Sequence, residues 1–209
     1  MAKQEALAEE EVLKAKPIKS ICVYCGSADG VHPEYYQAAS RMGQILAENG
    51  IILIYGGGKT GLMGAVADGA LAAGGEVIGV IPVNLNTPRL VHTGLTSLEV
   101  VQDIQQRKAR MSALAEAFIA LPGGFGTFDE LFETLTWAQI GLHCKPVGLL
   151  NTRGYFNPLL DLVRHAETEG FIYIEHSRLL CQSADPQALI AMLKDFRPPA
   201  GLERWVQRQ

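Results

Sequence analysis

Short apolar runs alternate with longer amphipathic stretches along most of the chain. The longer stretches, such as residues 33–49 and 62–74, have the length of helices. The apolar runs have the length of strands and lie at residues 18–25, 51–55, 77–81, 98–101, 117–121 and 146–150. Because strands alternate with helices, the pattern predicts an α/β fold in which a doubly wound parallel sheet carries helices on both faces.

The length and the hydrophobic content fit a single domain. The chain has 209 residues, of which 48% are hydrophobic, enough to bury a full core, and no linker-like segment divides it. We expect a polar tail rich in Ala, Glu and Lys at residues 1–16, a Rossmann-like domain at residues 17–198, and a C-terminal tail at residues 199–209.

Polar and glycine-rich turns follow three of the predicted strands. Ser27, residues 56–58 and residues 123–127 are expected to gather at the carboxyl ends of the strands, where the ligand crevice of such folds lies. Residues 121–130, Leu-Pro-Gly-Gly-Phe-Gly-Thr-Phe-Asp-Glu, predict a strand, a glycine turn and a helix with Glu130 in its first turn. Because amides that converge at such a turn bind anions, the segment predicts a phosphate-binding turn beside a carboxylate.

Two interpretations of Glu130 stay open from this segment alone. Thr127 and Glu130 have the spacing of a capping box, in which two side chains satisfy amides at a helix start. Glu130 is equally a candidate for catalysis. A second segment, residues 103–111, begins as another capped helix and carries three cations within four residues, a run that is usually a solvated helix face.

Together the two segments resemble the Lonely Guy (LOG) family of cytokinin riboside 5′-monophosphate phosphoribohydrolases, whose members are often mislabelled lysine decarboxylases. The resemblance rests on R-K-x-x-M at residues 107–111 and on P-G-G-x-G-T-x-x-E at residues 122–130. Further matches extend it over most of the chain and lie at residues 25–27, 55–58, 61–64, 67–70, 136–139 and 145–151.

The resemblance implies an enzyme that hydrolyses the N-glycosidic bond of a nucleoside 5′-monophosphate and releases free base and ribose 5-phosphate. It also implies that Arg107 and Glu130 are the essential pair and that the protein is a homodimer. The positions that match substrate-binding residues of the family are Lys108, Gly124, Phe125, Gly126, Thr127 and Thr136. Further candidate substrate-binding residues are Ser27, Gly57, Gly58, Arg89, Met111 and Gly123.

The chemistry of glycosidic cleavage suits these residue types. Positive charge develops on the sugar ring, and the carboxylate of Glu130 can stabilise it and help to deprotonate the attacking water. The guanidinium of Arg107 can stabilise the negative charge on the departing base, or hold the phosphate and the carboxylate in register. Met63 and Met111 are candidates for an apolar base pocket or for plain core packing.

Charge and hydropathy argue against two classes of partner. The net charge is −4, so the chain has no overall basic footprint for nucleic acid. The apolar runs are far shorter than a membrane span, and the charged N-terminal residues lack the apolar core of a signal peptide. We therefore expect a cytoplasmic protein that binds neither nucleic acid nor membranes.

Three motifs that suggest other chemistry do not fit. Residues 58–60, Gly-Lys-Thr, resemble the end of a Walker A loop, but Leu53 occupies the position of its leading glycine. Residues 56–61 match the dinucleotide fingerprint, but the next strand ends without a ribose-binding acid. Cys22 and Cys25 have C-x-x-C spacing but lie on a strand whose side chains alternate faces. With no metal-ligand spacing among the five histidines, no metal or cofactor is expected.

Two departures from the family pattern limit what the resemblance implies, and the first bears on either an active-site hydrogen bond or only a helix face. Gln105 stands where many members have histidine, and Leu90 stands where members usually have an acid that contacts substrate. The absence of this acid bears on recognition of the base or the ribose, and so on the choice between cytokinin nucleotides and AMP, rather than on the reaction type. Two alternatives stay open: a general nucleoside 5′-monophosphate nucleosidase, and a non-catalytic carrier of molybdenum cofactor or nucleotide, which would need the glycine turn but not Arg107 with Glu130.

Overall fold

The computed structural model describes residues 17–200 and Leu202, so the expected tail at residues 1–16 lies outside the described residues. Of the expected C-terminal tail, Leu202 is buried and packs with Ala138 and Leu179. Among the helices that these residues form, none is both long and apolar enough to cross a membrane.

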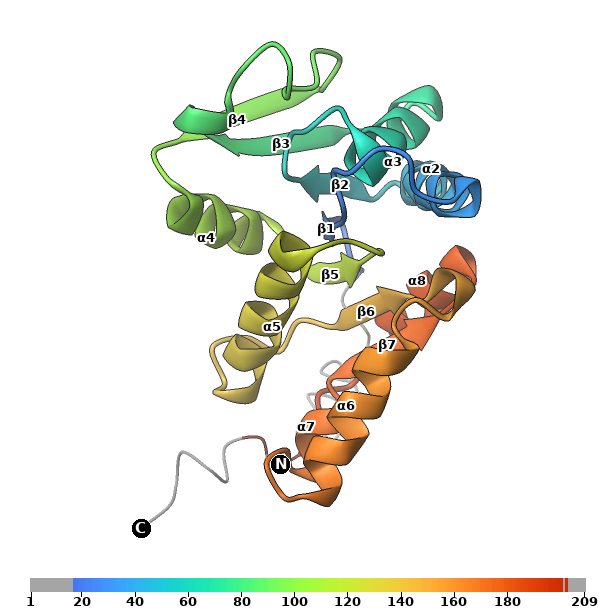
Figure 1. Cartoon of the computed structure of the whole chain (residues 1–209), viewed down its shortest axis with the longest axis vertical. Coiled ribbons are helices and arrows are strands. Elements are labelled where there is room, and N and C mark those ends of the chain that lie inside the picture. The colour runs from blue at the N-terminus through green and yellow to red at the C-terminus, as the bar shows by residue number, and fades with distance from the viewer. Residues whose placement is uncertain (1–16, 201, 203–209) are drawn as a thin grey trace, which may run out of the picture.

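Seven strands form one sheet in which every described pairing is parallel. They are β1 (Ser20–Tyr24), β2 (Ile52–Tyr55), β3 (Val77–Pro82), β4 (Ser97–Val101), β5 (Ala117–Ala120), β6 (Val147–Leu150) and β7 (Leu180–Ser183). Their order is β4-β3-β2-β1-β5-β6-β7 (Figure 1). The chain order reverses between β1 and β5, and this switch point is where an open parallel sheet forms its ligand crevice.

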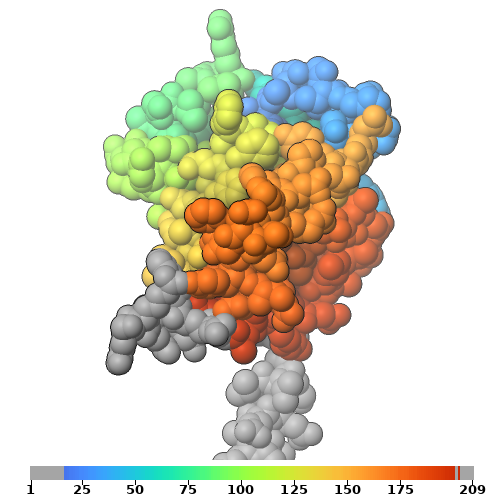
Figure 2. Space-filling model, turned by 60° about the horizontal axis from the view of Figure 1, so that its bottom comes forward, coloured from blue at the N-terminus to red at the C-terminus, as the bar shows by residue number. Residues whose placement is uncertain are grey.

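Helices cover both faces of the sheet, which confirms the predicted doubly wound α/β fold. They are α2 (Pro33–Glu48), α3 (Gly61–Ala72), α4 (Ile104–Leu114), α5 (Phe125–Gln139), α6 (Asn157–Thr168), α7 (Ile174–Ser177) and α8 (Pro186–Asp195), with short 3₁₀ turns η1 (Val83–Leu85) and η2 (Thr152–Gly154). Figure 2 shows α6 lying across one face of the molecule.

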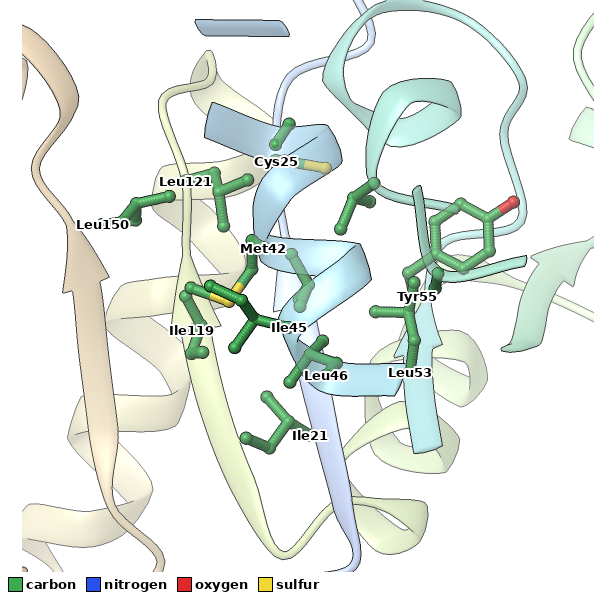
Figure 3. Packing of buried hydrophobic residues seen from close by; sticks show 14 of the residues in the cluster. Ile21, Cys25, Met42, Ile45, Leu46, Leu53, Tyr55, Ile119, Leu121 and Leu150 are labelled. Atoms are coloured by element: carbon green, nitrogen blue, oxygen red, sulfur yellow. The ribbon is translucent and has the colours of Figure 1, made fainter. Parts of the chain in front are cut away.

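Alternating side chains of the central strand divide the core into two clusters. Ile21 and Val23 of β1 join the cluster formed with α2, α3 and α8, whereas Cys22 and Tyr24 join the cluster formed with α4, α5 and α6. In the first cluster, shown in Figure 3, Met42, Ile45 and Leu46 of α2 pack over Ile21, Leu53 and Ile119. Burial on both faces explains why the central strands are continuous apolar runs.

The cysteine pair follows the same alternation. Cys22 and Cys25 belong to opposite clusters, and both are free thiols. Burial raises the pKa of each thiol, because the charged thiolate would lose its hydration. The two residues are core side chains, as predicted, rather than a redox or zinc pair.

Two elements depart from the sequence prediction, and one helix cap agrees with it. The strand β7 was not predicted. Asp103 caps α4 by accepting a hydrogen bond from the Gln106 amide, as expected. The helix α5 begins at Phe125, with Gly124 as its N-cap, so Glu130 lies in the second turn and the prediction of a first-turn carboxylate was wrong.

Candidate active site

A cavity of about 640 Å³ opens at the carboxyl ends of β1, β2 and β5, at the switch point of the sheet. Turns from these three strands form its floor, and α4 and α5 supply a charged pair. The lining residues at the turns and at the start of α5 are Gly26, Ser27, Ala28, Gly56, Gly58, Thr60, Pro122, Gly123, Gly124, Phe125, Gly126 and Thr127. The cavity therefore lies at the edge of the sheet where the sequence predicts the ligand crevice.

The turn after β5 is tightly packed at its first glycine and open beside Gly124 and Gly126. A Cβ on Gly123 would lie 2.1 Å from the Thr127 hydroxyl oxygen and 2.7 Å from the Gly26 nitrogen, so this position has room only for glycine. A Cβ on Gly124 or Gly126 would meet nothing within 4 Å. The first amides of α5 have no acceptor in their own helix and no side-chain cap. The turn thus offers free donors and the positive end of a helix to an anion.

Arg107 reaches the cavity from α4 and is held at two points. Its Nε donates to the carbonyl oxygen of Val80 over 3.0 Å, and its Nη1 lies 3.3 Å from Oε1 of Glu130. A Cβ on Gly56 would lie 1.7 Å from Nη2, so the glycine after β2 makes room for the guanidinium. The Arg107 and Glu130 side chains are 13% and 11% exposed, respectively. A fixed cation and a fixed carboxylate therefore share one wall of the cavity.

Burial dominates the electrostatics of Glu130. Loss of hydration raises the pKa of this carboxyl from 4.5 to about 7, although the Arg107 guanidinium acts in the opposite direction. Near neutral pH both protonation states are therefore populated. A carboxyl poised in this way can accept or return a proton during a reaction.

The capping-box interpretation of Glu130 was wrong. Since Gly124 is the N-cap of α5, Thr127 is already inside the helix and cannot cap it. The Glu130 carboxylate instead pairs with Arg107. A capping box therefore does not explain this acid, whose observed partner is a cation from another helix.

Most of the predicted site residues meet in the cavity, and four do not line it. Gly57 is buried behind the turn, where its carbonyl oxygen accepts from the His92 amide. The Lys108 ammonium pairs with carboxylates of α5 instead of facing the cavity. The Thr136 hydroxyl donates to a carbonyl of its own helix. Arg89 is exposed on the segment that follows η1.

One side of the cavity is apolar. Its side chains come from the start of α3, the end of β3, η1 and the segment after it, and α4, and they are Leu62, Met63, Ile81, Leu85, Leu90 and Met111. Met63 and Met111, the two candidates for a base pocket, both line it. The Phe125 side chain, at the start of α5, is 93% exposed and stands at the rim.

Two aromatic residues of the lining were missed by the sequence analysis. Tyr35 comes from α2, and Tyr155 follows η2. No local pattern marks either residue, because each reaches the site from an element that lacks a glycine turn into the cavity. No group of three or more His, Cys, Asp or Glu side chains that could hold a metal occurs within residues 17–200.

Comparisons with known proteins agree with the resemblance seen in the sequence. The model of the family described as "possible lysine decarboxylase" matches residues 63–193. A cytokinin riboside 5′-monophosphate phosphoribohydrolase of Arabidopsis thaliana is 45% identical over 86% of this chain and 83% of its own length. A protein of the same name from Rhodococcoides fascians is 50% identical over 76% of this chain and 81% of its own length.

Solved structures confirm the fold. The molybdenum cofactor binding protein of Rippkaea orientalis superposes with a TM-score of 0.66 over 85% of this chain and 96% of that chain, at 24% identity. At this identity the likeness concerns the fold alone. The family match and the relatives decide the assignment, and the chain belongs to the Lonely Guy (LOG) family, whose family model carries the description of possible lysine decarboxylases.

Proposed function

We propose that this protein hydrolyses the N-glycosidic bond of cytokinin riboside 5′-monophosphates and of AMP, releasing free base and ribose 5-phosphate. The observation that carries the proposal is the buried Arg107–Glu130 pair, which faces the same cavity as an open, glycine-lined helix start. The names of relatives that are 45% and 50% identical support it.

The 5′-phosphate is proposed to bind at the turn formed by residues 123–127. Free amides at the start of α5 would hold its oxygens, with the helix dipole favouring the negative charge. Binding energy at this remote group then fixes the sugar next to Glu130. Unphosphorylated nucleosides should react poorly because they lose this anchor.

Glu130 and Arg107 are proposed to act on the bond itself. The Glu130 carboxylate stabilises the oxocarbenium-like sugar and takes a proton from the attacking water, which its pKa of about 7 permits. Arg107, fixed by Val80 and Glu130, stabilises the negative charge on the departing base. The apolar side that includes Met63, Leu90 and Met111 takes the base.

The remaining predicted residues have supporting roles in this proposal. Ser27 and Gly58 line the cavity, and we propose that they contact the ribose. Gly57 supports the turn from behind, Arg89 adds positive charge near the opening, and Lys108 and Thr136 help to shape α4 and α5 around the pair.

The general nucleosidase and the cofactor carrier are the competing functions. A carrier would need the anion-binding turn but not a desolvated Arg–Glu pair, whose burial costs free energy that simple binding does not require. Leu90, on the apolar side of the cavity, bears on the choice between cytokinin nucleotides and AMP.

A product assay separates these functions. The protein is incubated with isopentenyladenosine monophosphate, AMP, another purine or pyrimidine monophosphate, and the matching nucleosides, and products are resolved by chromatography. Base release from monophosphates, lost in Glu130→Gln and Arg107→Ala, supports the proposal, and the preferred base decides between a cytokinin enzyme and a general nucleosidase. Tight binding of nucleotide or phosphorylated pterin without base release would favour the carrier.

We also propose a homodimer built on α4 and α5. These helices carry Arg107 and Glu130 and also expose apolar side chains, with Ile104 at 40% and Phe132 at 42% exposure. Unpaired apolar surface of this kind favours a second copy of the chain. A stable monomer at micromolar concentration in sedimentation experiments would contradict the dimer.

The proposed location is the cytoplasm. Cys22, Cys25, Cys144 and Cys181 are all free thiols, which suits a reducing compartment. The net charge of −4 suits a protein that binds neither nucleic acid nor anionic membranes.

A further inference from the structure

The hydroxyl of Tyr155 holds the backbone of the anion-binding turn. It donates a hydrogen bond to the carbonyl oxygen of Gly123, with 2.5 Å between the two oxygens. Tyr155 also lines the cavity, so its ring forms part of the wall beside the turn that it holds. The contact joins two segments 32 residues apart in the chain, one after β5 and the other after β6.

The peptide unit between Gly123 and Gly124 needs such a restraint. In a trans peptide the carbonyl and the N–H point in opposite directions, and a unit flanked by two glycines can rotate without a Cβ clash. A Cβ on Gly124 would meet nothing within 4 Å, so the space beside this residue is open. A flipped unit would reverse the Gly124 amide and turn the carbonyl oxygen of Gly123 away from Tyr155. An amide dipole reversed in this way weakens an anion site.

The backbone just before Tyr155 makes a sharp turn with two consecutive residues in the left-handed region. Arg153 has φ = 56°, a left-handed conformation that favours glycine, and Gly154 follows with φ = 68°. An ion pair of 2.6 Å between Arg153 and Glu34 connects this turn to α2. Strained backbone of this kind persists where the surroundings enforce it, and it gathers at functional sites.

Two aromatic neighbours fix the ring plane of Tyr155. Tyr35 lies edge-on with 6.0 Å between ring centroids, and Phe156 lies edge-on at 5.1 Å. The Phe156 amide donates a hydrogen bond to Oδ1 of Asn151 over 2.8 Å, and this bond closes the turn that carries Tyr155. The hydroxyl of Tyr155 therefore has a defined direction before any ligand arrives.

We propose that Tyr155 is a positioning residue that locks the Gly123–Gly124 peptide in the orientation that binds the substrate phosphate. The inference rests on the proposed function, because it takes the turn at residues 123–127 as the phosphate site. It assigns Tyr155 a role in affinity for the phosphate group and none in breaking the glycosidic bond.

The test uses Tyr155→Phe, which keeps the ring and removes the hydroxyl. Tyr36→Phe is the matched control, since its hydroxyl accepts from the Gly30 amide over 3.1 Å and Tyr36 does not line the cavity. Loss of one net hydrogen bond lowers the fraction of protein with the competent peptide orientation by up to about tenfold. It therefore predicts binding of ribose 5-phosphate that is weaker by up to about tenfold in titration calorimetry, and a KM for AMP that is higher by the same factor, with kcat little changed. Tyr36→Phe should keep wild-type values.

The outcomes separate this inference from the proposed function. Equal ribose 5-phosphate affinity in wild type and Tyr155→Phe would overturn the role of Tyr155 while leaving hydrolysis intact. Weakened binding in Tyr155→Phe, by a protein that releases no base, would support the role of Tyr155 and contradict the proposed hydrolysis. A fall in kcat at unchanged KM would also overturn the inference, because it would place the hydroxyl in the chemical step.

Discussion

Ionisation of Glu130 should lower the stability of the folded protein over a defined pH range. Burial raises the pKa of this carboxyl from 4.5 to about 7 in the folded state. Between these two values the folded protein holds a proton that the unfolded chain has released, so the free energy of unfolding falls as pH rises. The difference of about 2.5 pH units corresponds to about 3 kcal/mol, present below pH 4.5 and lost above pH 7.

The substitution Glu130→Gln isolates this contribution. Glutamine has nearly the same shape as the protonated acid but cannot ionise, so Glu130→Gln should match wild type near pH 4.5 and exceed it by about 3 kcal/mol at pH 8. Urea unfolding followed by circular dichroism at several pH values measures the difference. Glu133→Gln, on the same helix, is the control for removing a carboxylate from α5. Parallel pH curves for wild type and Glu130→Gln would refute the reasoning.

Three further predictions concern the rest of the site. Gly124→Ala should leave the melting temperature nearly unchanged but weaken AMP binding in calorimetry, since its methyl group enters open space in the phosphate turn. Gly123→Ala, in contrast, should lower the free energy of unfolding by about 1–3 kcal/mol, because its methyl group clashes with Thr127. Arg107→Lys should lower kcat/KM for AMP by about 100-fold in steady-state assays, because lysine cannot reproduce both guanidinium contacts. His92→Ala removes contacts of 3.0 Å to Asp68 and the Gly94 amide. It should raise KM about threefold to tenfold by loosening the segment that carries Leu90, one of the apolar side chains of the cavity.

The central strands could be predicted because each is buried on both faces. Apolar runs such as residues 51–55 and 117–121 end in glycine or proline turns, so their boundaries match β2 and β5 to within one residue. The edge strand β7 gives a weaker signal. Its Cys181 and Gln182 are not buried, and its pairing with β6 comes from the tertiary fold rather than from a local apolar run.

The start of α5 could not be read from local rules. Glycines at positions 124 and 126 are poor helix formers, so the sequence favours a later start at Thr127. The fold places Gly124 at the N-cap because the turn has to pass against Gly26. The direction of Glu130 is likewise set by Arg107, 23 residues away in the chain.

The partners of individual side chains also depend on distant elements. The residues next to Lys108 in the sequence do not indicate which carboxylates it pairs with. In the structure, Asp129 and Glu133, one helical turn apart on α5, both lie 3.0 Å from its ammonium. Tyr155 becomes a site residue only because the turn after β6 runs beside the turn after β5. Motif spacing identified the charged pair and the glycine turn, and the three-dimensional arrangement was needed for the residues that hold them.

The most direct test is a product balance for isopentenyladenosine monophosphate, measured by chromatography and mass spectrometry with wild type and Glu130→Gln. Hydrolysis of the glycosidic bond predicts free isopentenyladenine and ribose 5-phosphate in equal amounts from wild type, with neither product from Glu130→Gln. Release of the nucleoside with inorganic phosphate, or recovery of intact nucleotide from wild type, would contradict a site in which Arg107 and Glu130 cleave the bond between base and sugar.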